Sequence, residues 1–223
     1  MDDPYADEEI AAGDPRDSDE TLPPPAPRDV ATVTTEGLGV RRFDQWLVRN
    51  LSLNVAPGSV VTVEGPAGAG HSKVLLALSG RVAPDEGSVC VLGGAGAVGW
   101  IPELGMLDEQ LTVAETMTEC AGAIGAPEDA IADALELTDL RGWEDVLCAY
   151  LTTPQRVRLG MAWALLSRPV ALAVDATVGG PDDSLFALAF HIAKSGCVVL
   201  LGTAVPDAPS DMTIRLQPSE VTS

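Results

Sequence analysis

The sequence predicts an α/β fold with a mostly parallel sheet, an antiparallel β subdomain near the N-terminus and a small helical subdomain inserted between strands. Three observations carry this prediction. Residues 47–55 alternate apolar and polar side chains, as a half-buried antiparallel strand does. Residues 170–176 form a continuous apolar run ending in Asp175, which is typical of a buried parallel strand. Residues 112–140 have the apolar spacing of two amphipathic helices.

The N-terminal residues differ from the rest of the chain in composition. Residues 1–29 hold ten acidic side chains against two arginines and lead through a proline-rich stretch, so we expect a disordered acidic tail. We interpret it as a solvated tail, with binding to a basic partner as the alternative. Residues 30–223 are expected to form one domain, whose helical subdomain covers about residues 104–160.

Charge and cysteine use exclude several classes of protein. The net charge of −20 argues against nucleic acid or anionic lipid as a direct partner, since both favour a basic face. The four cysteines are widely spaced in apolar runs, and we expect reduced core residues, not disulfides or a zinc site. The acidic start is unlike a signal peptide, and no apolar run reaches the roughly 18 residues of a membrane helix. A cytoplasmic protein without direct membrane insertion is expected.

Further strands are predicted from short apolar runs between turn residues. The run 59–63 follows the turn 56–59 and leads into a glycine-rich segment. After the turn 83–87 come a strand at 88–94 and another at 98–103, which Pro102 ends. We expect residues 197–204 to form the last core strand.

Helix boundaries are marked by capping residues. Thr112 and Glu115 form a capping box ahead of the first inserted helix, and Pro127 is expected near the first turn of the second. A third helix is predicted to start with Thr153 as cap and Pro154 at the first position. A fourth, within residues 184–196, should end at Gly196.

The glycine-rich segment EGPAGAGHSKVLLALSG, residues 64–80, joins a predicted strand to a predicted helix. Compared with the phosphate-binding pattern G-x-x-x-x-G-K-[ST], Gly65, Gly70 and Ser72 match, whereas His71 stands at the lysine position. Glycines allow backbone N–H groups to surround phosphate oxygens at a helix N-terminus. Lys73 cannot replace the lysine, because it is the next helical position after Ser72 and its side chain therefore points about 100° away from that of Ser72. The alternative is a glycine-rich turn with no ligand.

The order of these segments resembles the ATP-binding cassette (ABC) domain, the ATP-binding part of ABC transporters, over residues 33–216. RNLSLNVAPGSVVTVEGPAGAG, VAPDEGSVCVLG and ELGMLDEQLTVAE carry the resemblance. It implies a P-loop NTPase with a RecA-like core. It also implies that Phe43 stacks on adenine, although a buried core phenylalanine is the alternative. Gly65, Gly68 and Gly70 match the phosphate loop. Ser72 and Asp175 match the residues that hold Mg²⁺.

Other functional positions of the family are altered. Glu103 stands where the family has a glutamine that contacts Mg²⁺ and the attacking water. Residues 152–155 (Thr152, Thr153, Pro154 and Gln155) lie at the signature sequence that faces a partner subunit, and both of its glycines are replaced. Asp182 matches the aspartate of the dimer-facing loop, although surface turns often carry aspartate. Ala176 and Ala204 replace the catalytic glutamate and the switch histidine, and His191 is expected to be structural, on an apolar helix face.

These changes predict a degenerate ATP-binding subunit with little or no hydrolysis of its own, since the groups that position water and stabilise charge are missing. Weak binding of ATP and Mg²⁺ stays open. The expected partners are a transmembrane transporter subunit and a second ATP-binding subunit, at the inner face of the cell membrane. One alternative is a soluble regulatory or scaffold protein that has kept the fold. Another is a P-loop enzyme of a different family that uses Asp175 and His71.

Overall fold

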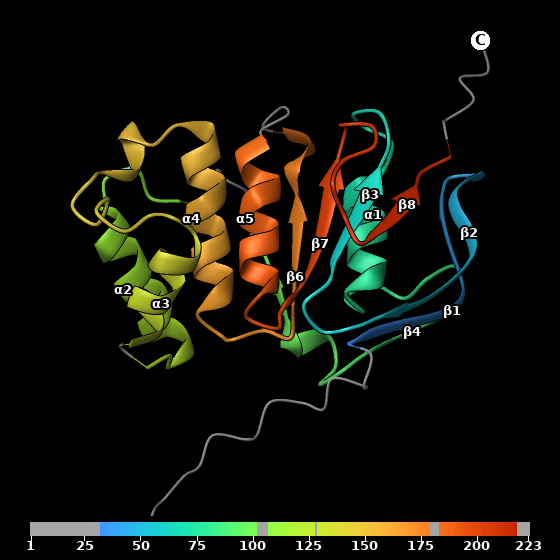
Figure 1. Ribbon diagram of the computed structural model, residues 1–223, viewed down its shortest axis with the longest axis horizontal. Coiled ribbons are helices and arrows are strands. Elements are labelled where there is room, and N and C mark those ends of the chain that lie inside the picture. The colour runs from blue at the N-terminus through green and yellow to red at the C-terminus, as the bar shows by residue number, and fades with distance from the viewer. Residues whose placement is uncertain (1–31, 102–106, 128, 179–182, 218–223) are drawn as a thin grey trace, which may run out of the picture.

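The eight strands of the part that the computed structural model describes, residues 32–101, 107–127, 129–178 and 183–217, form two sheets (Figure 1). An antiparallel sheet has the order β2-β1-β4, and a parallel sheet has the order β5-β6-β7-β3-β8. The strands are β1 Val33–Arg42, β2 Gln45–Val55, β3 Val60–Glu64, β4 Glu86–Val91, β5 Val98–Trp100, β6 Ala171–Asp175, β7 Val198–Thr203 and β8 Met212–Arg215.

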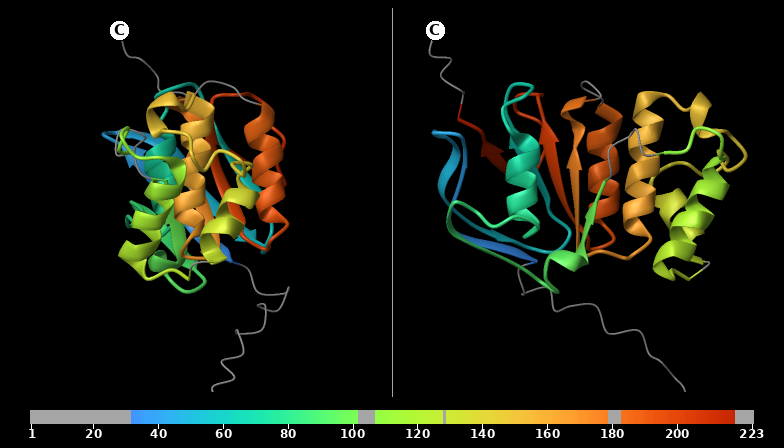
Figure 2. Two further views of the ribbon diagram at one scale, coloured as in Figure 1. Left: turned by 90° about the vertical axis from the view of Figure 1, so that its left-hand side faces the viewer. Right: turned by 180° about the vertical axis from the view of Figure 1, so that it is seen from behind.

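The helices of the described residues connect and cover these strands. They are α1 His71–Leu78, α2 Val113–Ile124, α3 Asp129–Leu137, α4 Thr153–Leu165 and α5 Asp183–Ala193, with short 3₁₀ turns η1 Ala95–Ala97, η3 Cys148–Tyr150 and η4 Ala176–Val178. None of these helices is long and apolar enough to cross a membrane. Figure 2 shows α2 and α3 at one end of the molecule and the antiparallel sheet at the other. The predicted combination of a parallel sheet, an antiparallel subdomain and a helical insert is therefore confirmed.

The parallel sheet is buried on both faces, as its continuous apolar strands predict. On β7, Val198 and Leu200 face the cluster that includes α1 and the antiparallel sheet, whereas Val199 and Leu201 face the cluster that includes α4 and α5. Successive residues of a strand point to opposite faces, so a run without polar residues serves both layers. Helix α1 lies between the two sheets, and this places the glycine-rich segment before it at the junction of both.

The helical insert begins where the capping residues predict. The side chain of Thr112 accepts a hydrogen bond from the N–H of Glu115 at 3.2 Å, and the Glu115 carboxylate accepts one from the N–H of Thr112 at 2.8 Å. These bonds satisfy two N–H groups that have no partner within the helix. Pro127 precedes the next helix, which starts at Asp129.

The expectation that residues 197–204 form the last core strand is wrong. β8 follows it and pairs in parallel with β3, with Ile214 buried. The segment MTIR is short and alternates buried and exposed residues because β8 is the edge strand of its sheet. A four-residue alternation is a weak signal beside the long apolar runs of the inner strands.

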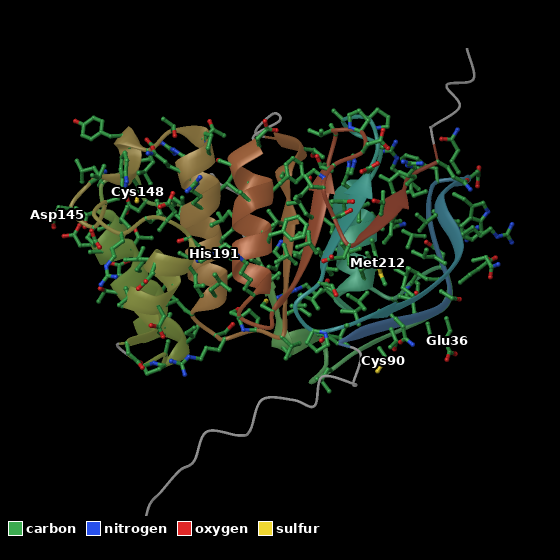
Figure 3. The ribbon with its side chains drawn as sticks, in the orientation of Figure 1. Glu36, Cys90, Asp145, Cys148, His191 and Met212 are labelled. Carbon is green, nitrogen blue, oxygen red and sulfur yellow. The ribbon has the colours of Figure 1, made fainter. Side chains whose placement is uncertain are left out.

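Two further expectations about burial are wrong in part. Cys148 and Cys197 are buried and Cys120 is half-buried, but Cys90 is exposed, because β4 is an edge strand with one face in solvent (Figure 3).

His191 does not lie on the apolar face of α5: Leu188, Ala189 and Ile192 are buried there, whereas His191 is exposed (Figure 3). Burial raises the pKa of the Cys197 thiol to about 12.

Candidate nucleotide-binding site

The glycine-rich loop joins the end of β3 to the start of α1, as the motif requires. Gly70 precedes the helix with φ 107°, and a Cβ atom there would lie 2.5 Å from Cδ1 of Leu47 on β2. Glycine is therefore needed at this position for both conformation and space. Gly68 also has a positive φ of 78°, and no atom beyond its two chain neighbours lies within 4 Å of the position its Cβ would take. The loop turns tightly and one side of it is open at Gly68.

His71 is turned into the loop. Its side chain is 2% exposed, and Nε2 donates a hydrogen bond to the carbonyl oxygen of Gly65 at 3.1 Å. The first turn of the helix also packs on β7, where a Cβ at Gly202 would meet Cβ of His71 at 3.1 Å. The imidazole thus fills space inside the loop and binds the loop's own backbone.

Ser72 and Asp175 meet at the carboxyl ends of two strands. The hydroxyl of Ser72 donates to Oδ2 of Asp175, the last residue of β6. Oδ1 of Asp175 accepts from the hydroxyl of Thr177 at 2.6 Å and from its N–H at 3.2 Å. A hydroxyl and a carboxylate are oxygen ligands of the kind that Mg²⁺ uses together with substrate phosphates. The donor set therefore fits Mg²⁺, and Thr177, which sequence reasoning missed, orients the carboxylate.

Lys73 points away from the loop, as the helix geometry predicts. Its Nζ donates to the carbonyl oxygen of Arg41 on β1 and lies 3.6 Å from Asp85. Asp85 also accepts a hydrogen bond from the N–H of Arg41, which lowers the pKa of that carboxyl. Lys73 therefore ties α1 to the antiparallel sheet.

Phe43 lies at the tip of the hairpin between β1 and β2. The alternative of a buried core residue is wrong, because Phe43 is 90% exposed. Its φ of 55° is unusual for a bulky residue and carries a strain of order 1–3 kcal/mol. Arg42 next to it is half-buried, and its Nη1 donates to the carbonyl oxygen of Gly68 at 2.7 Å. An exposed ring and the glycine-rich loop are thus held close together.

The start of α4 differs by one residue from the prediction. Thr152 is the N-cap, Thr153 is the first helical residue and Pro154 the second. The N–H and the hydroxyl of Thr152 both donate to the side-chain oxygen of Gln155 at 2.9 Å. Sequence reasoning took the cap to be the residue directly before proline, but proline is also accepted at the second position of a first turn, where N–H groups have no helical partner. Thr152, Thr153 and Pro154 are exposed and Gln155 is half-buried.

The two alanines lie along the same edge of the sheet as the loop. Ala176 follows β6 and Ala204 follows β7, and these strands run parallel to β3, which leads into the loop. Their methyl groups can neither accept a proton nor donate a hydrogen bond. Glu103 and Asp182 lie outside the described residues.

Comparison with solved structures identifies the fold. CbiO1 from Clostridium perfringens, part of the ABC transporter complex cbiONQ, matches with a TM-score of 0.71 and 18% identity over 85% of this chain and 86% of its own. An inward-facing structure of a metal-chelate type ABC transporter matches with a TM-score of 0.70 and 19% identity, over 84% of this chain and 80% of its own. The fold is that of the ATP-binding P-loop domains of ABC transporters.

Sequence comparison places the chain in a family. The family model described as "ABC transporter" matches residues 48–178, more than half of the chain, and this protein belongs to that family. The zinc import ATP-binding protein ZnuC of Rhizobium etli is 34% identical over 187 residues, 81% of this chain and 59% of ZnuC. The cytochrome c biogenesis ATP-binding export protein CcmA of Pseudomonas fluorescens is 33% identical over 181 residues, 74% of this chain and 86% of CcmA. The match thus covers about three fifths of the length of that ZnuC.

Proposed function

We propose that this chain is an ATP-binding subunit of an ABC transporter that hydrolyses little or no ATP itself. The observation that carries the proposal is His71. Where the phosphate-loop pattern has a lysine, a buried imidazole binds the carbonyl oxygen of Gly65. The loop keeps its glycines and its Ser72–Asp175 pair but lacks the full positive charge that faces a γ-phosphate.

Loss of hydrolysis follows from the edge of the sheet beside the loop. Metal-assisted phosphoryl transfer to water needs a group that positions the water and groups that stabilise the developing charge. Ala176 and Ala204 supply neither. Ser72 and Asp175 would hold Mg²⁺, which would neutralise phosphate charge when bound. Thr177 keeps the Asp175 carboxylate oriented, and the loop N–H groups and α1 bind phosphate oxygens.

The proposed assembly pairs this subunit with a membrane-spanning transporter subunit and a second ATP-binding subunit, at the cytoplasmic face of the membrane. Its support is family membership together with the exposed residues Thr152, Thr153 and Pro154 at the start of α4, which stand at the position of the family's dimer-facing signature although its glycines are replaced. Proline supplies no N–H for a partner's phosphate. We therefore assign this segment to the dimer face and leave ATP turnover to the partner subunit.

Phosphate release by the purified chain tests the catalytic part of the proposal. Wild type and Asp175→Ala should both release phosphate from Mg²⁺-ATP at the rate of the buffer alone. Magnesium-dependent release by wild type that Asp175→Ala abolishes would contradict the proposal.

Co-purification from native membranes tests the assembly. A tagged chain should recover a multi-span membrane protein and a second ATP-binding protein after detergent extraction. Recovery of soluble partners only would favour a regulatory or scaffold protein with the same fold.

A further inference from the structure

The phosphate loop is closed by one of its own side chains. His71 is the first residue of α1, and its imidazole reaches back to the first glycine of the loop. There Nε2 donates to the carbonyl oxygen of Gly65 at 3.1 Å. The side chain is buried, so water does not separate it from the loop. The imidazole thus spans the loop from the start of the helix to the end of β3.

Contacts with β7 hold this arrangement in place. The N–H of Gly65 donates to the carbonyl oxygen of Thr203, the last residue of β7, at 3.2 Å. Both backbone groups of Gly65 therefore have partners within the protein. A Cβ at Gly202 would lie 3.1 Å from Cβ of His71 and 3.4 Å from Oδ1 of Asp175. His71 thus borders the same small space as the carboxylate that would hold Mg²⁺.

The hydrogen bond to Gly65 leaves the imidazole without a donor for phosphate. A neutral imidazole has one ring nitrogen that donates and one that accepts. Because Nε2–H is bonded to Gly65, Nδ1 carries the lone pair, which repels a phosphate oxygen. Backbone N–H groups surround a phosphate only when the loop between them is empty. In this position His71 blocks the loop and does not act as its ligand.

We propose that His71 is an internal plug of the phosphate loop, and that a nucleotide binds only after the imidazole has left its bond to Gly65. This inference rests on the proposed function, because it takes the loop to bind a nucleotide. The loop then has a closed state with the imidazole inside and an open state that admits phosphate. Since a nucleotide binds the open state alone, the fraction of open protein reduces the apparent affinity. The contact is autoinhibitory, and its effect adds to that of the missing lysine.

Truncation of His71 gives opposite results for a plug and for a ligand. His71→Ala removes the ring together with its hydrogen bond, so the loop is open without further cost. Calorimetric titration of the full chain with Mg²⁺-ATP should show binding about 5-fold tighter than wild type, which corresponds to one neutral hydrogen bond of about 1 kcal/mol. A phosphate ligand would instead give weaker binding when it is removed. His191→Ala, at an exposed position on α5, is the matched control and should bind as wild type does.

The truncated chain has to be folded for this comparison. Urea unfolding checks His71→Ala, and His71→Ser, which also lacks the ring, takes its place if the alanine variant is unfolded. Equal or weaker ATP binding by the truncated chain would overturn the plug. Absence of measurable binding by both wild type and the truncated chain would overturn it as well, because the imidazole would then not be what closes the loop.

Magnetic resonance of the wild-type chain observes the plug directly. The chain has two histidines, so His191→Ala assigns their side-chain signals by removing one of them. The Nε2 proton of His71 is buried and hydrogen-bonded, and it should give a slowly exchanging signal in the free protein. Saturating Mg²⁺-ATP should abolish that signal. Its persistence in the complex, or its absence from the free protein, would contradict a plug that ATP displaces.

Failure of the plug can be told apart from failure of the proposed function. ATP binding by His71→Lys without tighter binding by His71→Ala would overturn the plug alone, because the loop would then lack only the charge of the lysine. The transporter subunit is judged by co-purification, which does not depend on His71.

Discussion

At the scale of single residues, the site combines kept and altered groups. Ser72 and Asp175, which the resemblance to ABC domains assigns to one Mg²⁺ site, are joined by a hydrogen bond, and Lys73 points away from the loop. His71 is the residue whose behaviour sequence alone did not reveal. It does not reach toward a ligand but closes a hydrogen bond to Gly65 within the loop.

Replacing His71 by lysine should strengthen Mg²⁺-ATP binding by roughly two decades. A new charge contact contributes about 2–4 kcal/mol at an effective dielectric constant near 20, and about 1.4 kcal/mol corresponds to one decade. His71→Lys should still not hydrolyse ATP, because Ala176 and Ala204 are unchanged. Calorimetric titration measures the affinity.

His191→Lys is the matched control for this prediction. It makes the same substitution on the exposed last turn of α5, where a cation also favours the helix dipole. It should leave ATP affinity unchanged. If His71→Lys binds no better than wild type, the missing lysine does not limit binding at this loop.

The buried thiol of Cys197 predicts a loss of stability in alkali. Burial raises its pKa from 9.0 to about 12. Above pH 9 the unfolded chain loses this proton while the folded chain keeps it, so the free energy of unfolding falls as pH rises. The fall due to this group is about 1.4 kcal/mol per pH unit between pH 9 and pH 12, and it is absent below pH 9. Urea unfolding at pH 8, 9 and 10 measures it.

Two alanine variants separate Cys197 from other groups that titrate in alkali. Cys197→Ala should show a shallower decrease of unfolding free energy with pH than wild type, whatever its stability at pH 8. Cys90→Ala, at an exposed position, should keep the wild-type slope. Equal slopes for all three proteins would refute the assignment to Cys197.

At the scale of elements, capping residues set the helix starts, and their exact positions matter. α2 begins after Thr112 as predicted, but α4 begins one residue earlier than predicted. Residues 152–155, which the resemblance to ABC domains predicts to be the signature region, form an ordinary helix start held by Thr152 and Gln155.

Alanine substitutions of the two adjacent threonines at the start of α4 test whether Thr152 is the N-cap. Thr152→Ala should lower the free energy of unfolding by about 1 kcal/mol, since it removes the hydroxyl of the N-cap. Thr153→Ala should change it by less than about 0.5 kcal/mol, because exposed substitutions away from caps have small effects. Urea denaturation of both variants beside wild type measures the difference. The reverse order would place the cap at Thr153.

At the scale of the whole molecule, residues 1–29 lie outside the described part of the chain. Their acidic, proline-rich composition cannot bury an apolar core. Deleting them should change the melting temperature by less than about 2 °C, which for a domain of this size corresponds to under about 1 kcal/mol. Differential scanning calorimetry of the full and shortened chains measures this. A fall of more than about 4 °C would mean that these residues pack on the domain.

The fold class and the strand that precedes the glycine-rich loop could be predicted, because both depend on the pattern of apolar and polar residues within short segments. The unbroken apolar runs of β6 and β7 predict strands that are buried on both faces. The alternation of apolar and polar residues in β2 predicts a strand with one face exposed to solvent. Glycine spacing located the loop, because backbone N–H groups can surround phosphate only where side chains are absent. The resemblance to ABC domains placed Ser72, Asp175 and Phe43 in one site. Edge strand β8 was missed because four residues carry too little periodicity.

The sequence by itself determined the α/β architecture, the loop between β3 and α1 and the loss of the lysine, because each is set by residue types and their spacing along the chain. Only the tertiary structure decided which partner each polar group of the site takes. The imidazole of His71 binds Gly65, Thr177 orients Asp175, and Arg42 crosses from the hairpin to Gly68. The Arg42 contact joins residues 26 positions apart, and the packing of the antiparallel sheet against α1 brings them together. Spacing along the chain carries no information about such a contact until the two sheets are packed.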